Sequence, residues 1–122
     1  MSELAMQHAA AFEGELPPMP IEPAWILEGD PVAKGTVIVQ SADKLVSTGL
    51  WSCTTGKFRW TFSGDEFVYL LAGEVTVTDS TGGKITLRPG DLAHFPRGAE
   101  TVWHVTQEVR KVFTLRTPEP LE

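Results

Sequence analysis

Apolar and polar positions alternate with a period of two through most of the chain beyond residue 34. This period is typical of strands that bury one face, because successive side chains of a strand point to opposite sides. Gly and Pro interrupt the alternation at short intervals, as at Gly64, Gly73 and Pro89-Gly90, and no helical period lies between the breaks. The pattern predicts strands over residues 35–40, 45–53, 58–62, 66–71, 74–78, 84–88, 92–95, 101–105 and 109–116.

Many short strands without intervening helices predict an all-β fold, either an antiparallel sandwich or a barrel. Residues 75–87, VTVTDSTGGKITL, have the pattern of a hairpin closed by a Gly-Gly loop. A chain of 122 residues corresponds to one domain by length and can bury a core without disulfides. We therefore expect a barrel over residues 35–122, preceded by an N-terminal arm over residues 1–34.

The arm differs from the barrel in composition. Residues 2–12 are a candidate for one short helix, with Ser2 as its N-cap. Five of the nine prolines then lie within residues 17–31. Because proline donates no backbone hydrogen bond and fixes φ, this proline-rich segment is expected to be extended and to lie along the outside of the barrel.

Charge is concentrated in the arm. Residues 1–33 contain six acidic residues and no Lys or Arg, which equals the formal net charge of −6, so the remainder is balanced. An acidic arm on a neutral body repels nucleic acid and anionic membranes, and we exclude both as partners. A single Cys53, no signal-peptide pattern and no apolar run long enough to span a membrane predict a cytosolic (cytoplasmic) protein.

Residues 58–73, FRWTFSGDEFVYLLAG, combine aromatic side chains with one carboxylate. In a strand, Phe58, Trp60 and Phe62 share one face, and Glu66 follows after a small polar turn. Three interpretations are open at this point. The aromatic side chains fill a core, they line a ligand pocket, or they are what remains of a metal site.

The spacing around this segment resembles that of the cupins. Glu66 is followed after six residues by Gly73, and Gly90 is followed after five residues by Pro96-Arg97-Gly98. These spacings match E-x6-G and G-x5-P-x-G within the two cupin motifs. Over about residues 20–117 the chain looks like the small cupin family related to the metal-binding domain of (S)-ureidoglycine aminohydrolase. The resemblance implies a double-stranded β-helix, which is a jelly-roll barrel that commonly pairs as a homodimer.

Cupins commonly hold a metal with three histidines and the motif glutamate, and this sequence departs from that set. By the motif spacing, the positions of the paired histidines are occupied here by Trp60 and Phe62, or by Arg59 and Thr61. The third falls at Thr101. None of these side chains is a good ligand for a divalent metal ion. We therefore expect no metal and no cofactor.

The histidines elsewhere in the sequence offer a poor replacement. Alternation from an inward Thr101 turns His104 outward. A site made of His94 and Glu66 alone stays open as a weak alternative, because two ligands rarely hold a metal tightly.

Glu66 needs an explanation if it faces the barrel interior. A carboxylate among aromatic rings loses hydration, so it requires a partner or a raised pKa. Arg59 and Lys111 are the candidate partners. If either pairs with Glu66, the group is structural. If Glu66 is unpaired, it suits a cationic or amine-bearing ligand, or acts as a general base.

We predict a cupin that binds a small organic molecule, an amine-bearing one, without a metal, with Glu66 as the candidate catalytic group. The alternative is a manganese-dependent enzyme resembling ureidoglycine aminohydrolase, which acts on a ureido or amine compound. Metal analysis of the protein separates the two, since kinship of fold does not carry function. The candidate ligand-binding residues are Trp60, Phe62, Glu66, Tyr69, Thr101, Trp103, Arg59 and Lys111.

Overall fold

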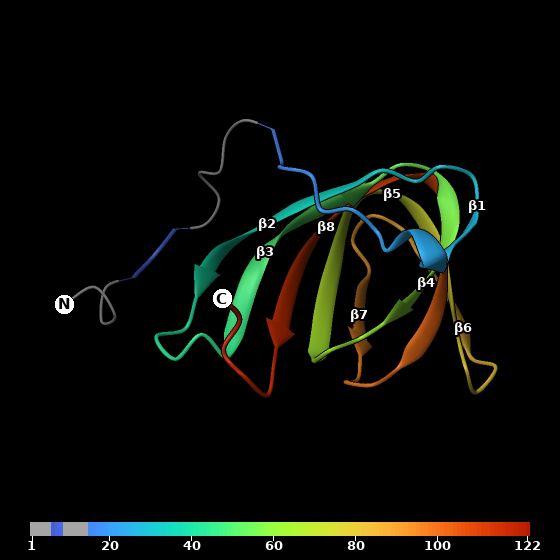
Figure 1. Ribbon diagram of the computed structural model, residues 1–122. Coiled ribbons are helices and arrows are strands. Elements are labelled where there is room, and N and C mark those ends of the chain that lie inside the picture. The colour runs from blue at the N-terminus through green and yellow to red at the C-terminus, as the bar shows by residue number, and fades with distance from the viewer. Residues whose placement is uncertain (1–5, 9–14) are drawn as a thin grey trace.

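The computed structural model describes residues 6–8 and 15–122. Apart from a 3-10 turn at Pro23–Trp25, its regular structure is entirely β (Figure 1), which confirms the predicted all-β class. No helix among the described residues has the length and apolarity of a membrane span. The strands are β1 (Ile26–Glu28), β2 (Ala33–Gln40), β3 (Val46–Cys53), β4 (Gly56–Thr61), β5 (Asp65–Asp79), β6 (Lys84–Leu87), β7 (Leu92–Phe95) and β8 (Glu100–Arg116).

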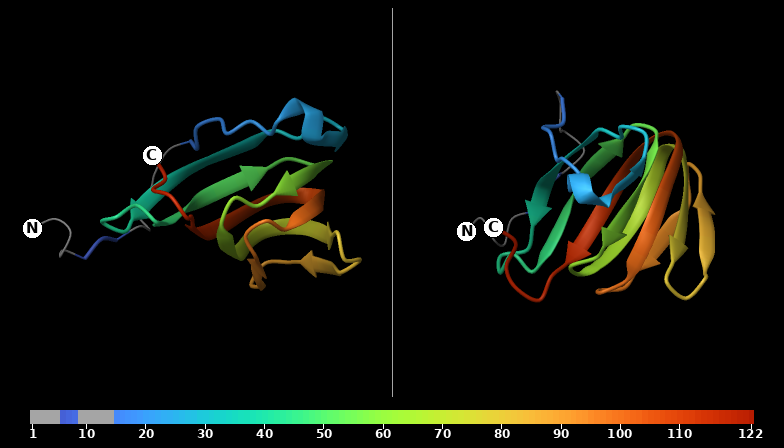
Figure 2. Two further views of the ribbon diagram at one scale, coloured as in Figure 1. Left: turned by 60° about the horizontal axis from the view of Figure 1, so that its bottom comes forward. Right: turned by 45° about the vertical axis from the view of Figure 1, so that its right-hand side comes forward.

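The strands form one curled antiparallel sheet in the order β1-β4-β8-β3-β2, and β5 joins it through β8. One side of β5 pairs with β8 along its length, and the other side pairs with β7 and β6. Figure 2 shows how the sheet curls, so that β2 and β3 lie over one side of the interior and β5 to β7 over the other. This is the barrel architecture that the sequence predicts.

β5 and β8 correct the predicted strand boundaries. The pairs of strands expected over 66–71 and 74–78, and over 101–105 and 109–116, are two continuous bent strands. Their ladder shifts register around Gly73, where φ is +84° and a Cβ atom would collide with the carbonyl oxygen of Glu108. The glycine therefore marks a bulge within a strand and not its end, because a bulge bends the strand while pairing continues.

The proline-rich segment is attached to the barrel more closely than expected. Leu16 and Ile21 are buried, and the Met19 amide donates to the Ala33 carbonyl at 3.0 Å. The segment also contributes β1, a strand that the proline content concealed, which pairs with β4. The division of the chain at residue 34 stays a prediction. The helix expected over residues 2–12 lies largely on residues outside the described part of the chain.

Aromatic side chains dominate the core between the two sides of the barrel. Phe62 stacks on Phe95 with ring centroids 4.8 Å apart, and Phe58 stacks on Trp103 at 6.2 Å. Cys53 is 1% exposed, as expected of a small buried hydrophobic residue. Burial raises the pKa of its thiol to about 12, so the thiol stays protonated at neutral pH.

The hairpin between β5 and β6 forms as predicted, with Val75 opposite Leu87. Asp79 closes the turn: its Oδ1 accepts hydrogen bonds from the Thr81 hydroxyl at 2.7 Å and from the Gly83 amide at 2.8 Å. These hydrogen bonds, led by that of the Thr81 side chain, hold the pKa of Asp79 below its ordinary value of 3.8.

Replacing Asp79 by Asn should lower the thermal unfolding midpoint at neutral pH, because the charged acceptor is lost. The folded pKa of Asp79 lies below the ordinary value, so its contribution is complete above pH 3.8 and is lost as the pH falls through the folded pKa. The difference between the wild type and Asp79→Asn should therefore shrink in acid. Asp30→Asn, at an exposed loop position, is the matched control. Equal midpoints for both variants at neutral pH would contradict the assignment.

Candidate functional site

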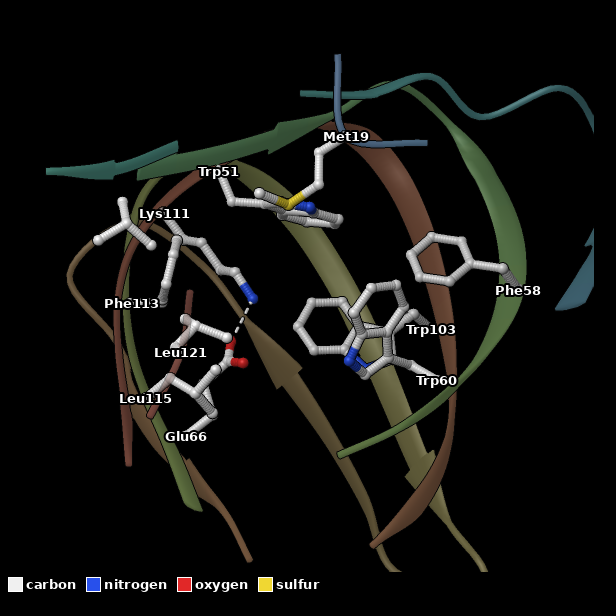
Figure 3. A pocket seen from close by; sticks show the side chains of 11 residues that line it. Met19, Trp51, Phe58, Trp60, Glu66, Trp103, Lys111, Phe113, Leu115 and Leu121 are labelled. Carbon is white, nitrogen blue, oxygen red and sulfur yellow. Dashed lines mark hydrogen bonds and ion pairs between the residues drawn. The ribbon is translucent and has the colours of Figure 1, made fainter. Parts of the chain in front are cut away.

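A cavity of about 220 Å³ lies inside the barrel between β3, β4, β5 and β8 (Figure 3). Its wall is aromatic and aliphatic apart from one acidic and one basic side chain. The residues that line it are Met19, Val37, Trp51, Phe58, Trp60, Glu66, Trp103, Lys111, Phe113, Leu115 and Leu121.

Strand alternation places these side chains. Along β8, Lys111, Phe113 and Leu115 are two residues apart and share the inner face. Lys111 lies directly opposite Trp51 of β3. At the other end of the cavity, Trp103 of β8 lies opposite Phe58 of β4. The inner face of β8 thus lines both ends of the cavity, with Lys111 at one end and Trp103 at the other.

Glu66 and Lys111 form a buried ion pair. Lys111 Nζ donates to Glu66 Oε2 at 2.7 Å, and the two side chains are 7% and 10% exposed respectively. Lys111 Nζ also lies 4.6 Å from the Trp51 ring centroid and 4.8 Å from that of Trp103. The carboxylate and two ring faces compensate the lysine for its lost hydration. Of the two cations considered from the sequence, Lys111 is the partner, so Glu66 Oε2 has the structural role expected of a paired carboxylate.

The second oxygen of Glu66, Oε1, has no hydrogen-bond partner in the part of the chain that the structure describes. No side-chain polar atom of the described residues is both unpaired and sealed from solvent, so Oε1 must keep contact with accessible space. Figure 3 shows the carboxylate projecting from β5 toward the cavity. Glu66 Oε1 is therefore a hydrogen-bond acceptor without a partner among the described residues. It faces a cavity, called the chamber below, whose wall is apolar apart from Glu66 and Lys111.

Thr101 holds the indole that forms part of the chamber wall. Trp103 Nε1 donates to Thr101 Oγ1 at 3.1 Å, and the Thr101 hydroxyl donates to the Trp60 carbonyl at 2.7 Å. Thr101 is buried and lies outside the cavity lining. Its role in the structure is to orient Trp103, because a buried indole N–H needs an acceptor.

The structure brings together Trp60, Glu66, Trp103 and Lys111 from the predicted set. Phe62 is buried beside the chamber against Phe95. Arg59 and Tyr69 do not line the cavity. Arg59 is exposed, and Tyr69 is 42% exposed on the face of β5 opposite to Glu66. Strand alternation explains both positions, because Arg59 lies one residue from the inward Trp60 and Tyr69 lies three residues from the inward Glu66.

Some residues of the cavity wall were not predicted from the sequence. Trp51 is not among the candidate residues from the sequence, and it covers Lys111 within the cavity. Alternation from Lys111 would have found Phe113 and Leu115. Met19 and Leu121 carried no such signal, because they come from segments outside the regular strands.

The histidines do not complete a metal site with Glu66. His94 points to the outer side, where its Nε2 lies 3.1 Å from Asp65 Oδ1 and its ring stacks on Phe67. That hydrogen bond is the main reason why the pKa of Asp65 is lowered. His104 is exposed, as alternation predicts. The described residues contain no cluster of three or more His, Cys, Asp or Glu side chains suited to a metal ion.

Segments near both chain ends border the chamber. A surface depression of about 660 Å³ shares Met19, Val37 and Leu121 with the cavity. Leu121 is held by its amide, which donates to the Lys44 carbonyl, and by its carbonyl, which accepts from Gln40 Nε2 at 2.9 Å. These three side chains line both spaces, and we refer to this shared border as the mouth of the chamber.

Residues 40–113 match a family model described as the EutQ-like cupin domain. Among solved structures, the chain is similar to a putative ethanolamine utilization protein Q from Salmonella typhimurium, at 23% identity over 70% of this chain and 69% of that one, with a TM-score of 0.62. A DUF861 family protein from Thermotoga maritima is 36% identical over 54% of this chain and 75% of that one, with a TM-score of 0.53.

A DUF861 family protein of unknown function from Pseudomonas syringae pv. tomato is 22% identical over 84% of this chain, with a TM-score of 0.75. This chain spans 44% of that protein's length. A search of curated proteins gives no significant match. These similarities confirm the cupin fold, and none of them bears on a relationship to ureidoglycine aminohydrolase in particular.

Replacing Glu66 by Gln should lower the free energy of unfolding by about 3–5 kcal/mol, because it leaves the Lys111 ammonium buried without its counter-ion. Denaturant titration of the variant and the wild type measures the difference. Combining Glu66→Gln with Lys111→Met should recover part of the loss, since both buried charges are then gone.

The exposed ion pair between Glu28 and Lys57, with an N–O distance of 3.5 Å, provides the control. Glu28→Gln should change the free energy of unfolding by at most about 1 kcal/mol. A Glu66→Gln effect no larger than that of Glu28→Gln would show that the inner pair is hydrated and that the chamber is open to water.

Proposed function

The chain belongs to the EutQ-like cupin domain family, and on this premise we propose that it is a metal-independent binding protein for a small organic molecule. The molecule occupies the chamber inside the barrel, packs against its indole and phenyl rings, and donates one hydrogen bond to Glu66 Oε1. The observation that carries the proposal is this free carboxylate oxygen in a chamber whose other polar group, Lys111, is already engaged.

The size and wall of the chamber limit the ligand. At about 220 Å³ it lies below the ~300–1,000 Å³ of pockets for drug-sized ligands, so the ligand is small. The wall contributes hydrophobic surface and ring faces and offers one free acceptor. A compact molecule with an apolar body and one O–H or N–H group satisfies these features.

Lys111 makes an uncharged ligand the better fit. Its ammonium group lies 2.7 Å from Glu66 Oε2 and covers ring faces of both Trp51 and Trp103. A second cation would meet the repulsion of this fixed charge at short range in a medium that screens poorly. We therefore propose that the amine-bearing ligand expected from the sequence binds in its neutral form. A neutral amine, like an alcohol, donates a hydrogen bond without adding a second positive charge.

The alternative function is release of ammonia from a ureido or amine compound with the help of bound manganese. The donor set fits this metal poorly, because Trp60 and Phe62 have no ligating atom and the Thr101 hydroxyl is engaged by Trp60 and Trp103. Glu66 itself is held by Lys111. Stoichiometric manganese, zinc or nickel in the purified protein would favour this enzyme over the binding protein.

We also propose that the protein pairs as a homodimer. Phe67, Tyr69 and Leu92 lie together on the outer side of β5 and β7, and they are 51%, 42% and 78% exposed. Large exposed apolar groups that gather in one place are typical of interfaces. The cytosolic location expected from the sequence stays a prediction.

Benzyl alcohol and the benzylammonium ion share one apolar body and differ in charge, which makes them suitable probes of the chamber. We expect benzyl alcohol to bind at least about tenfold more tightly at neutral pH, a difference of about 1.4 kcal/mol, because Lys111 repels the ammonium group. Isothermal titration calorimetry measures both affinities. Tighter binding of benzylammonium would contradict the proposed role of the ion pair.

Val37→Trp places a large side chain at the mouth and should abolish the binding of benzyl alcohol. Val46→Trp is the matched control on β3, since Val46 is 38% exposed and does not line the chamber. Equal binding by the two variants would place the ligand elsewhere.

Sedimentation of the wild type at micromolar concentration should give a dimer. Leu92→Asp should shift it toward a monomer, because a charge then replaces the most exposed side chain of the apolar group. Ile85→Asp, on β6 and 43% exposed, should leave the dimer intact. A wild-type monomer would refute pairing.

A further inference from the structure

Lys111 differs from the other lysines of the chain in its surroundings. It is 6% exposed, whereas the other four lysines are exposed or partly exposed at the surface: Lys34, Lys44, Lys57 and Lys84. Its Nζ lines the ligand chamber, lies 2.7 Å from a carboxylate and lies over two indole rings. A lysine that acts as a nucleophile must first lose a proton, and here a carboxylate lies within hydrogen-bond distance to accept it.

We propose that Lys111 forms a reversible imine with the carbonyl carbon of a small, uncharged aldehyde bound in the chamber. The proposal rests on the proposed function, since the aldehyde occupies the same space as the organic ligand. An aldehyde donates no hydrogen bond to Glu66, and its carbonyl oxygen instead takes up a proton from Glu66 during the reaction. The proposal adds a covalent step and a substrate class: aldehydes whose remaining part is apolar and small enough for about 220 Å³.

Glu66 supplies the proton transfers that imine formation requires. Its Oε2 accepts a proton from the Lys111 ammonium along the 2.7 Å hydrogen bond, which frees the nitrogen lone pair. The nitrogen attacks the carbonyl carbon, and the carbonyl oxygen takes up the proton from Glu66. Glu66 then removes a second proton from the nitrogen and returns it to the new hydroxyl group, which leaves as water.

The balance of this step is one ammonium and one aldehyde converted into one iminium ion and one water, with no oxidant or reductant. The product carries the same positive charge as the resting lysine, in the same place. The Glu66 carboxylate and the rings of Trp51 and Trp103, which stabilise the ammonium, therefore also stabilise the iminium. The apolar wall keeps water away from the bond and slows its hydrolysis.

Reductive trapping with benzaldehyde and sodium cyanoborohydride tests the proposal, with peptide mapping of each lysine over time. We expect Lys111 to be benzylated about 100-fold faster than Lys84, the advantage that a positioned general base provides. Surface lysines in the same molecule serve as internal references, so the result does not depend on the folding of a variant. Lys111 labelling no faster than that of Lys84 would overturn the proposal.

Two variants refine the assignment. Glu66→Gln should slow the labelling of Lys111 by about 100-fold while leaving Lys84 unchanged, because the proton acceptor is lost. Lys84→Arg, remote from the chamber, should leave the labelling rate of Lys111 unchanged. An unchanged Lys111 rate in a folded Glu66→Gln variant would refute the role of Glu66 as the base.

Benzyl alcohol separates failure of this proposal from failure of the proposed function, because it matches benzaldehyde in shape and forms no imine. It should protect Lys111, and not Lys84, from labelling. If benzyl alcohol binds and Lys111 is not trapped, the binding function stands and the imine is refuted. If benzyl alcohol does not bind, both proposals fail. Rapid Lys111 labelling without protection would show that the aldehyde does not share the binding site of benzyl alcohol and would overturn the imine proposal.

Discussion

The ion pair between Glu66 and Lys111 constrains the interior of this barrel more than any other interaction in the structure. Two charges are held in an apolar chamber at 7% and 10% exposure, and each would be costly without the other. Lys111 faces inward because β8 is in register with β3 on one side and β5 on the other, opposite Trp51 and Leu70. A slip of one residue would turn Lys111 outward and leave Glu66 unpaired, so the pair helps to fix the register.

The same pair accounts for the chemistry of the site. Where a typical cupin has histidines around its glutamate, this chain has Trp60, Phe62 and Thr101, and a lysine from another strand neutralises the carboxylate. One carboxylate oxygen stays available, and the rings around the ammonium form a cage for a positive charge. The proposed organic ligand and the proposed imine both depend on this arrangement.

The sequence predicted the parts of the structure that depend on local pattern. Period-two alternation and Gly/Pro breaks predicted the all-β class and the hairpin over residues 75–87, and the motif spacing predicted that Glu66 faces inward. The role of Asp79 in closing that hairpin was not predicted. The continuity of β5 was missed because a bulge at Gly73 has the same composition as a turn. That of β8 was missed because three consecutive exposed polar residues, 106–108, interrupt the alternation. The choice between Arg59 and Lys111 stayed open, since it depends on the face each occupies after long-range pairing. Leu121 enters the chamber from a segment outside the regular strands, which no local pattern predicts.

The most direct test of the account is a crystal structure determined with manganese and benzyl alcohol both present, with anomalous data collected for the metal. We expect the hydroxyl of benzyl alcohol within hydrogen-bond distance of Glu66 Oε1, Lys111 still bound to Oε2, and no anomalous peak at the carboxylate. An anomalous peak at Glu66 with Lys111 displaced from it would contradict the account and identify the chamber as a metal centre.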